Sequence, residues 1–363
     1  MRLLFPALGA ISLGTYSSMM LKRDGSLWNT GLADREFGTW DPKLQWTTFR
    51  IVMLGGVKAM DAKTDHSIVL KQDGSVYTRG ANGDGQLGDG SNTFRRSYVK
   101  VFTGGVIAVS AGRFHSVILM QDSSVWATGN NIDGQLGVES NIARVGVLKF
   151  AQVVLKGVKA ISAGSDYTLI LKEDGSVWAT GYNAFGQLGD GSTDISRKTF
   201  GQVISSDVAA IFAGWYHSLL LKQDNSLWAT GWNALGQLGD GSFTDRRTFG
   251  KVVSSGVRSA AAGYDHTMML KQDGSVWVTG SNSLGQLGDG SYTDRRNFVR
   301  VVSSGALAVA AGVYHSMVIQ EDDSVWATGR NNYGQLGDGS KIVKNCFTVV
   351  ASTIDGAWRA VFL

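Results

Sequence analysis

The chain has 363 residues, of which 34 are basic, 30 are acidic, 48 are glycine and 2 are proline. No stretch has the unbroken apolar length of a membrane-spanning helix, so the composition predicts a soluble chain with no membrane span. A formal charge of +4 is too small to indicate nucleic acid as a partner by bulk electrostatics, and the single cysteine, Cys346, excludes an intramolecular disulfide and a multi-cysteine metal site.

The first segment, "MRLLFPALGAISLG", admits two interpretations. One basic residue followed by an apolar run is typical of a secretory signal. The same segment aligns without a gap on "VRVVSSGALAVAAG" at 299–312, with Gly14 on Gly312. We interpret it as part of a repeated unit, because a signal peptide rarely doubles as a strand of the fold. The compartment stays open.

The repeat fills the chain. One aromatic residue marks each unit, and the markers follow one another at steps of 49 to 52 residues: Trp28, Tyr77, Trp126, Trp178, Trp228, Trp277 and Trp326. A near-constant period of this size indicates a repeat architecture. We therefore expect residues 1–363 to form a single domain of seven similar units.

Residues 257–302 illustrate one unit. Four short apolar runs separated by turn residues, "VRSAAAG", "HTMMLK", "SVWVTG" and "NFVRVV", predict four strands, and "QDG" predicts a tight hairpin between the second and third. The alternation in "SVWVTG" places Trp277 on the opposite face from Val276 and Val278. We expect this aromatic residue to pack between neighbouring units.

A four-stranded antiparallel meander repeated seven times predicts an all-β fold, a seven-bladed β-propeller whose ring is closed by strands from both termini. We expect residues 10–13 to form the innermost strand of the first blade. Either Leu3 and Leu4 or residues 347–350 should complete the outer edge of the last blade. Residues 357–362 should then pack outside the ring or bind another chain.

The units resemble the repeats of the regulator of chromosome condensation family. The stretch that carries the resemblance is "AGRFHSVILMQDSSVWATGNNIDGQLG" at 111–137, with its counterparts in the other units. The first unit, which reads "WNTGLADREFGTW" from Trp28, departs most. The resemblance implies a seven-bladed propeller, and it makes guanine-nucleotide exchange on a small GTPase an alternative function. That activity is associated with an additional projecting element, for which steps of 49 to 52 residues leave no room.

The glycine-rich string is not a nucleotide site. "GDGQLG" at 83–88 matches Gly-x-Gly-x-x-Gly, but neither the helix nor the later acidic residue of a dinucleotide fold is apparent. In later units the first glycine is replaced while "GQLG" persists. We interpret the string as a corner between the third and fourth strands.

Histidine and aspartate also recur with the period. The five histidines hold one place in the unit: His66, His115, His217, His266 and His315. We expect each to form a hydrogen bond within its own blade. The aspartates of "GDGS" should accept hydrogen bonds from turn amides. No nucleophile–base pair, carboxylate pair or metal cluster stands apart from the repeat, so we predict no enzyme, no cofactor and no metal.

One face of the disc is the candidate binding site. The loops between strands one and two and between strands three and four open on the same face and vary among units. Trp, Tyr and Arg are enriched in binding hot spots, and loops on a rigid scaffold commonly carry recognition. The predicted partner-binding residues in these loops are Arg113, Phe114, Tyr182, Trp215, Tyr216, Trp232, Tyr264, Tyr314, Arg330 and Tyr333. Half-buried packing at the corners is the alternative.

The same loops carry basic pairs that would form a rim: Arg95 and Arg96, Arg197 and Lys198, Arg246 and Arg247, and Arg295 and Arg296. The rim is either a solvated edge, neutralised locally by Asp194, Asp245 or Asp294, or a site for phosphate or an acidic protein.

The functional hypothesis is a non-enzymatic protein-binding scaffold that presents its variable aromatic and arginine face to another protein or a larger assembly. Guanine-nucleotide exchange is one alternative. A chromatin or nucleic-acid binder is the other, and it lacks the long basic tail expected of such a protein.

Overall fold

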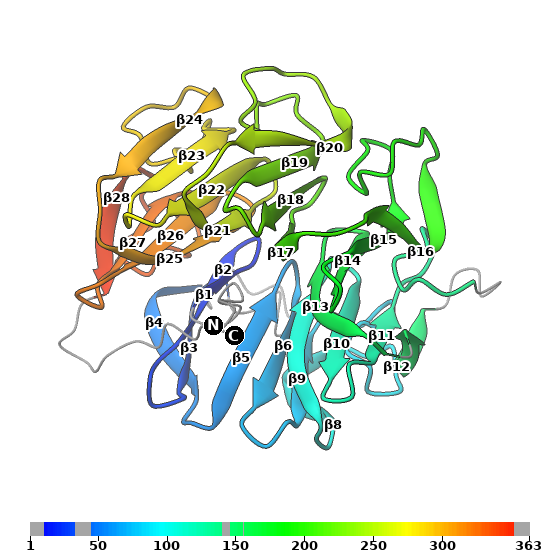
Figure 1. Cartoon of the computed structure of the whole chain (residues 1–363). Helices are drawn as coiled ribbons and strands as arrows, with labels where there is room; N and C mark the ends of the chain where they lie inside the picture. The colour runs from blue at the N-terminus through cyan, green and yellow to red at the C-terminus, as the bar shows by residue number, and fades with distance from the viewer. Residues whose placement is uncertain (1–10, 33–44, 140–145, 155, 352–363) are drawn as a thin grey trace.

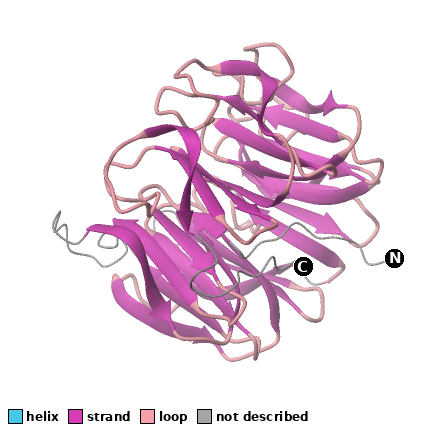
Figure 2. Cartoon of the chain, turned by 90° about the vertical axis from the view of Figure 1, so that its left-hand side faces the viewer, coloured by secondary structure: helices cyan, strands magenta, loops and turns pink. Residues whose placement is uncertain are grey.

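The computed structural model describes residues 11–32, 45–139, 146–154 and 156–351. Within these residues all the regular secondary structure consists of β-strands, as Figure 2 shows. The strands form seven four-stranded antiparallel sheets arranged as the blades of a ring (Figure 1). The predicted all-β, seven-bladed propeller is confirmed.

Each blade is a meander of four consecutive strands. Blades one to three are β1 (Ile11–Leu13), β2 (Ser17–Leu21), β3 (Leu27–Leu32), β4 (Gln45–Met53); β5 (Val57–Ala62), β6 (His66–Lys71), β7 (Val76–Gly80), β8 (Arg95–Phe102); β9 (Val106–Ala111), β10 (His115–Met120), β11 (Val125–Gly129), β12 (Val147–Val154). Blades four and five are β13 (Val158–Ala163), β14 (Tyr167–Lys172), β15 (Val177–Tyr182), β16 (Ser196–Ile204); β17 (Val208–Ala213), β18 (His217–Lys222), β19 (Leu227–Gly231), β20 (Arg246–Val253). Blades six and seven are β21 (Val257–Ala262), β22 (His266–Lys271), β23 (Val276–Gly280), β24 (Arg295–Val302); β25 (Ala306–Ala311), β26 (His315–Gln320), β27 (Val325–Gly329), β28 (Lys344–Ala351).

The first strand of each blade lies at the ring axis. An axial cavity of about 160 Å³ is lined by residues of β1, β5, β9, β13, β17, β21 and β25, one strand from every blade. The fourth strand, which pairs only with the third, therefore forms the outer edge of each sheet.

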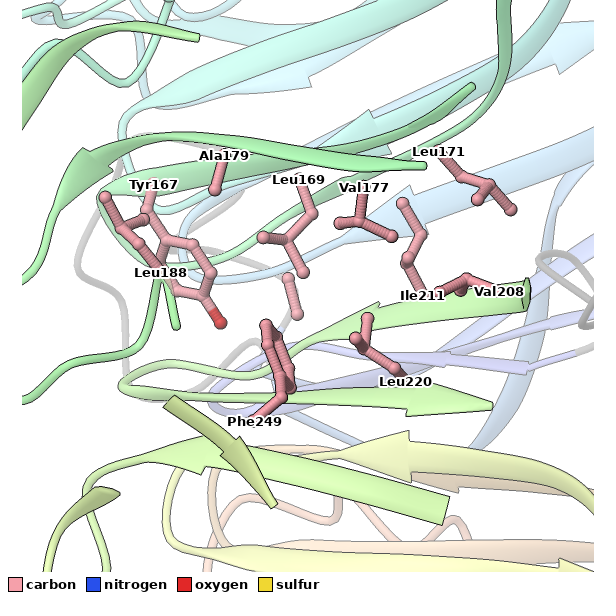
Figure 3. Close-up of a cluster of buried hydrophobic side chains, with 11 residues drawn as sticks. Tyr167, Leu169, Leu171, Val177, Ala179, Leu188, Val208, Ile211, Leu220 and Phe249 are labelled. Carbon is pink, nitrogen blue, oxygen red and sulfur yellow. The ribbon is translucent and has the colours of Figure 1, made fainter. Parts of the chain in front are cut away.

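The hydrophobic core lies between the faces of adjacent sheets. Figure 3 shows the cluster between the fourth and fifth blades, with residues of β14, β15 and the loop after β15 opposite residues of β17, β18 and β20: Tyr167, Leu169, Leu171, Val177, Ala179, Leu188, Val208, Ile211, Leu220 and Phe249. Trp228 packs against the same cluster. In the sixth blade, Trp277 packs toward the fifth blade while Val276 and Val278 pack toward the seventh. The predicted position of the marker aromatic residue is confirmed.

The "GQLG" corner joins each blade to the next. Gly189 of the fourth blade lies against the ring of Phe249 in the fifth blade, at a φ of 75° that favours glycine. Thr230 Oγ1 donates a hydrogen bond to the Gly186 carbonyl oxygen at 2.9 Å. Asp190 forms an isolated β-bridge with Thr248. We call this set the corner contact. The string is architectural, as expected, and its role is to link two blades.

The corner contact recurs around the ring. The threonine-to-glycine hydrogen bonds, each between adjacent blades, are Thr30–Gly334, Thr128–Gly85, Thr180–Gly134, Thr230–Gly186, Thr279–Gly236 and Thr328–Gly285. A phenylalanine of the next blade lies against the corner glycine in the same six places.

The histidines bond to the next blade, so the expectation of a partner within the same blade was wrong. His66 Nε2 lies 2.9 Å from Ser116 Oγ of the third blade, and this hydroxyl donates to the Gln86 carbonyl oxygen at 2.8 Å. Because the hydroxyl hydrogen is committed to Gln86, His66 must donate from Nε2–H. The other four histidines make the equivalent contact with a serine or threonine of the following blade: His115–Thr168, His217–Thr267, His266–Ser316 and His315–Ser18. The period of the sequence does not show whether the partner of a histidine lies in its own blade or in the next one.

The ring closes by the same contacts. His315 Nε2 of the last blade lies 2.8 Å from Ser18 Oγ of the first, and Asp338 bridges to Thr48. Leu13 and Met20 pack into the core of the seventh blade. Figure 1 shows the β1–β3 sheet beside β25–β27. β1 confirms residues 11–13 of the expected inner strand of the first blade, and β28 confirms the 347–350 alternative for the outer edge of the last blade. Each described sheet consists of four consecutive strands, so no described sheet combines strands from both termini, contrary to the expected closure. Residue 10, Leu3, Leu4 and residues 357–362 lie outside the described residues.

The junction between the first and second blades differs from the others. Arg79 stands where other units have the corner threonine; it is buried, and its guanidinium lies 4.7 Å from the ring centre of Tyr98. Tyr98 in turn replaces the usual phenylalanine, and its hydroxyl lies 3.0 Å from Ser67 Oγ. Ser17 takes the histidine position. The first unit, whose sequence differs most from the repeat, therefore lies beside a second unit that also differs from it at the contact positions.

Alanine substitution at two glycines should distinguish the stability contributed by the corner contact from the cost of backbone strain alone. Gly337 and Gly339 share one loop and have φ values of 78° and 82°. A Cβ on Gly337 would overlap the Phe49 ring, whereas a Cβ on Gly339 would meet nothing within 4 Å. Gly339→Ala should cost about 1 kcal/mol of unfolding free energy from strain alone. Gly337→Ala should cost a further 1–3 kcal/mol, roughly, from overpacking. Urea unfolding measures both, and equal losses would contradict the assigned closing contact.

The buried histidines should make the fold sensitive to mild acid. Burial lowers the pKa of His66 to about 4 and those of His115, His217 and His315 to about 3. An unfolded histidine titrates near 6.5, so the unfolded state binds more protons below that pH. Stability is thus retained above pH 6.5 and lost as pH falls toward 4. Between pH 7 and pH 5 each of the four should cost roughly 2 kcal/mol.

The measurement is urea unfolding at pH 7 and pH 5 together with NMR of the imidazole rings. Burial raises the pKa values of Asp61, Asp133 and Asp166, and these carboxyls act in the opposite direction. The ring signals isolate the histidine contribution. They should show the neutral Nε2–H form for these four side chains in the folded protein at pH 5. Protonated rings in a fully folded chain at that pH would contradict the assignment.

Candidate functional site

The ten predicted partner-binding residues lie at one end of the blades, nine on loops and Tyr182 as the last residue of β15, and each is partly exposed. Arg113, Trp215, Tyr264 and Tyr314 are on first-to-second loops, while Trp232 and Tyr333 are on third-to-fourth loops. Their rings and guanidinium groups contact one another across blade boundaries, which shows that the two kinds of loop meet on the same face.

Tyr216 lies at the centre of the contacts. Its ring centre is 5.2 Å from that of Phe185, 6.2 Å from those of Tyr182 and Trp232, and 5.8 Å from that of Tyr264. Trp215 lies 4.5 Å from Tyr264, which in turn lies 6.2 Å from Tyr314. Most of these pairs are tilted or edge-to-face, the arrangements that aromatic quadrupoles favour. We call this set, Tyr182, Phe185, Trp215, Tyr216, Trp232, Tyr264 and Tyr314, the aromatic layer.

An arginine closes each end of the aromatic layer. The Arg113 guanidinium lies 4.6 Å from the ring centre of Phe114 and 5.5 Å from that of Trp215. The Arg330 guanidinium lies 5.3 Å from Tyr314, 5.4 Å from Tyr333 and 5.5 Å from Tyr16. Such cation–π contacts hold the guanidinium planes over the rings. The structure thus brings all ten predicted residues into one connected surface spanning the third to the seventh blade.

Sequence reasoning missed Tyr16 of the first blade. Its ring lies 5.0 Å from Tyr333, edge-to-face. The signal was present, because "LGTYS" aligns with "AGVYH" and places Tyr16 on Tyr314. Also missed was an outer row of exposed apolar residues on the third-to-fourth loops of blades four to seven, 51% to 68% exposed: Ile195, Phe243, Tyr292 and Ile342. Each lies a few residues after "GDGS", where the units vary.

Carboxylates gather beside the aromatic layer on the second, third and fourth blades. The pKa of Asp133 is raised by burial and then by the charge of Asp166. The pKa of Asp166 is also raised by burial, and the charge of Asp84 raises it further. We call Asp84, Asp133 and Asp166 the acidic trio. The pKa of Tyr182 is raised by burial and then by the charges of Asp133 and Asp166. The trio therefore meets the aromatic layer at Tyr182.

Lys63 lies at the end of the axial cavity on this face. It follows β5 in the place where the other six units have glycine. Its Nζ donates to the carbonyl oxygens of Ala163 at 2.6 Å and Ala213 at 2.9 Å, on the opposite side of the ring. Burial lowers the pKa of Lys63 to about 8, an effect that the nearby Asp61 partly offsets. The side chain spans the ring opening.

The basic rim is largely paired within the protein. The first arginine of the pairs bonds to the "GDGS" aspartate of its own loop, at 2.6 Å for Arg246 Nε to Asp240 Oδ2 and 3.0 Å for Arg197 Nη1 to Asp190 Oδ2. Arg95 with Asp89 and Arg295 with Asp289 do the same. The expected neutralisation by Asp245 and Asp294 was wrong, since these accept backbone hydrogen bonds from Asn233 and Asn282.

The second members of the pairs differ among themselves. Arg247 donates to the carbonyl oxygens of Ser192 and Ala184 in the preceding blade, and Arg296 lies 5.7 Å from the ring centre of Phe243. Arg96 is exposed. The "GDGS" aspartates also accept turn amides as predicted, for example Ser91 N to Asp89 Oδ1 at 2.9 Å.

Family models of the regulator of chromosome condensation (RCC1) repeat match most of the units. One matches residues 57–86, 106–135, 158–187, 208–237, 257–286 and 307–335, and the other matches 73–119, 174–221, 224–270 and 273–319. The chain belongs to the RCC1-repeat family. The matches begin at residue 57, so the first unit, which departs most in sequence, lies outside them.

Individual relatives are more distant. RCC1 domain-containing protein RUG3, mitochondrial, from Arabidopsis thaliana is 33% identical over 85 residues, which is 23% of this chain and 19% of that protein. Among solved structures, human WBSCR16 has a TM-score of 0.75 at 21% identity, covering 87% of each chain. Prp20p from Saccharomyces cerevisiae has a TM-score of 0.73 at 22% identity, covering 84% of this chain and 80% of that one. These structures establish the shared RCC1-type fold.

The described residues hold no group of three or more His, Cys, Asp or Glu side chains arranged to bind a metal ion. They also include no helix with the length and apolar character needed to cross a bilayer.

Adjacent arginines of the rim test whether it is structural. Asp89 is buried against Arg95, with 7% of its side chain exposed. Arg95→Ala should leave this carboxylate without its cation and cost about 1–2 kcal/mol of unfolding free energy, a value reduced by the partial exposure of Arg95. Arg96→Ala, the matched control, should stay within about 0.5 kcal/mol. Thermal unfolding measures both. If Arg95→Ala left the stability unchanged, the rim arginines would again be candidates for a ligand site.

Proposed function

We propose that this protein is a non-enzymatic protein-binding scaffold whose partner docks on the aromatic layer. The observation that carries the proposal is the continuous contact of seven aromatic side chains, each partly exposed, on the variable loops of one face. Large aromatic residues supply much contact area at a low entropic cost and are enriched in binding hot spots.

The scaffold beneath this layer supports binding. The loops that carry the rings are held by corner contacts and by hydrogen bonds between blades, so a partner meets a preformed surface and little loop ordering opposes association. Four exposed apolar side chains lie on the third-to-fourth loops of blades four to seven, on the same face: Ile195, Phe243, Tyr292 and Ile342. Exposed apolar residues gathered around a site are typical of protein–protein contact.

Other members of the fold provide a precedent for protein partners. The yeast RCC1 protein Prp20 has been solved bound to Kap60, and Prp20p has been described with binding properties toward Gsp1p and histones. Those partners belong to those proteins. For this chain, the pairing of rim arginines with internal carboxylates argues against a site for nucleic-acid phosphates.

Replacing Trp215, Tyr216 and Trp232 together with alanine should abolish partner binding and leave the ring folded. Buried hot-spot aromatics each contribute roughly 2 kcal/mol or more, so the joint loss should exceed a hundredfold in affinity. The measurement is affinity capture from native extract with the intact chain and the triple variant as baits, followed by binding assays with the purified candidate.

The matched control is Leu54→Ser, which removes a side chain that is 86% exposed in the turn between the first and second blades, on the opposite face. It should retain the partner. A triple variant that loses its cooperative thermal transition would show that the three rings are core. Accelerated nucleotide release from a candidate GTPase, lost in the triple variant, would favour the exchange alternative over a purely passive scaffold.

A further inference from the structure

The aromatic layer has an acidic border at the boundary between the third and fourth blades. Asp133 and Asp166 come from the third-to-fourth loop of the third blade and the first-to-second loop of the fourth. The Tyr182 backbone N–H donates to the Asp166 carbonyl oxygen at 2.8 Å, so these two residues are neighbours. The charges of Asp133 and Asp166 act on Tyr182, and that of Asp166 acts also on Tyr216, at the centre of the layer. An apolar surface and a negatively charged surface therefore meet along the boundary between the third and fourth blades.

Burial is the largest influence on the Asp133 and Asp166 carboxyls, ahead of the cations that act on them. Asp166 Oδ2 also accepts a hydrogen bond from Ser165 Oγ. Arg113 acts on Asp166 and Lys198 acts on Asp133, yet the pKa of each carboxyl is raised, with burial as the largest cause and a second carboxylate adding to it. Lys198 Nζ donates to the Ile132 carbonyl oxygen, and the Arg113 guanidinium lies over Phe114 and Trp215. Asp84 accepts a hydrogen bond from Asn130 Nδ2 at 2.7 Å. Among the described residues, the cations that act on Asp133 and Asp166 are thus engaged in other contacts as well.

A further carboxylate lies under the other side of the layer. The Asp265 side chain is 10% exposed, and its Oδ1 accepts no hydrogen bond from the described residues. Its charge contributes to the raised pKa values of Tyr264 and Tyr314, for both of which burial is the largest cause. His266 Nδ1 is 3.9 Å away. Negative potential thus reaches the ring faces from two directions.

We propose that the boundary of the aromatic layer and the acidic trio binds an arginine or lysine side chain of an extended segment of a protein partner. The inference rests on the proposed scaffold function and specifies the chemistry of its partner. A cation entering beside Tyr182 would lie against aromatic faces and within reach of Asp133 and Asp166. Desolvated cation–π contacts and charge-assisted hydrogen bonds to carboxylates would then act on one group. The same carboxylates would repel an acidic segment.

The test is selection of random 12-residue peptides displayed on phage against the intact chain. Enriched peptides should carry arginine or lysine, and their synthetic versions should bind in a fluorescence polarisation assay. Asp133→Asn combined with Asp166→Asn should weaken binding at least tenfold. The matched control combines Glu173→Gln with Glu321→Gln, which removes the same charge from exposed positions in second-to-third turns on the opposite face. It should bind as the unmodified chain does.

The pH dependence gives a second readout. A bound cation favours the ionised carboxyls, so affinity should fall as pH is lowered from 7 to 5 in the unmodified chain. The Asp133→Asn, Asp166→Asn variant should show a smaller pH dependence. Selected peptides without basic residues, or equal affinity for this variant and its control, would overturn the inference.

Failure of this inference is distinguishable from failure of the scaffold proposal. If the Trp215, Tyr216 and Trp232 variant loses a partner that the Asp133→Asn, Asp166→Asn variant still binds with unchanged affinity, the aromatic face is a docking site but its partner is not recognised through a basic side chain. If neither variant changes the affinity for the partner or the peptides, both proposals fail.

Discussion

The contact between one blade's third-to-fourth corner and the outer strand of the next blade is the interaction on which the rest of this structure depends. A four-stranded sheet alone exposes two apolar faces, and only a neighbour on each side buries both. Gly189 against Phe249, with Thr230 on the Gly186 carbonyl, sets the position of one sheet on the next. The same contact between Asp338 and Thr48 joins the seventh blade to the first, so each described sheet keeps four consecutive strands while the ring still closes.

This frame explains why one face carries the variable loops. The glycines, threonines and aspartates of each corner are committed to the adjacent blade, and the first rim arginines are committed to those aspartates. What remains variable is the pair of residues before each histidine and the stretch after "GDGS". Because these positions surround one end of the axis, aromatic side chains from units about 50 residues apart become neighbours. The residues at these positions can therefore vary without disturbing the core.

Much of this arrangement could be predicted because it follows from local pattern. Alternation in "SVWVTG" placed Trp277 correctly between sheets, and alignment of the loops gathered all ten candidate residues on one face. The hydrogen-bond partners of the histidines could not be obtained in this way. A repeat with identical units looks the same whether His66 bonds to Ser67 or to Ser116, and only the lateral packing of the blades selects the second. The pairing of Arg246 with Asp240, in place of Asp245, likewise depends on how the loop turns.

The sequence by itself determined the number of blades, the strands of each blade and the residues on the face of the variable loops, because period and alternation are properties of neighbouring residues along the chain. The tertiary structure decided which side chains share a site. Lys63 reaches Ala163 and Ala213 across the axis, and Asp166 acts on Asp133 across a blade boundary. Those distances depend on the curvature of the closed ring, which no segment of the chain contains, and so the acidic border of the aromatic layer emerges only when the seven sheets pack together.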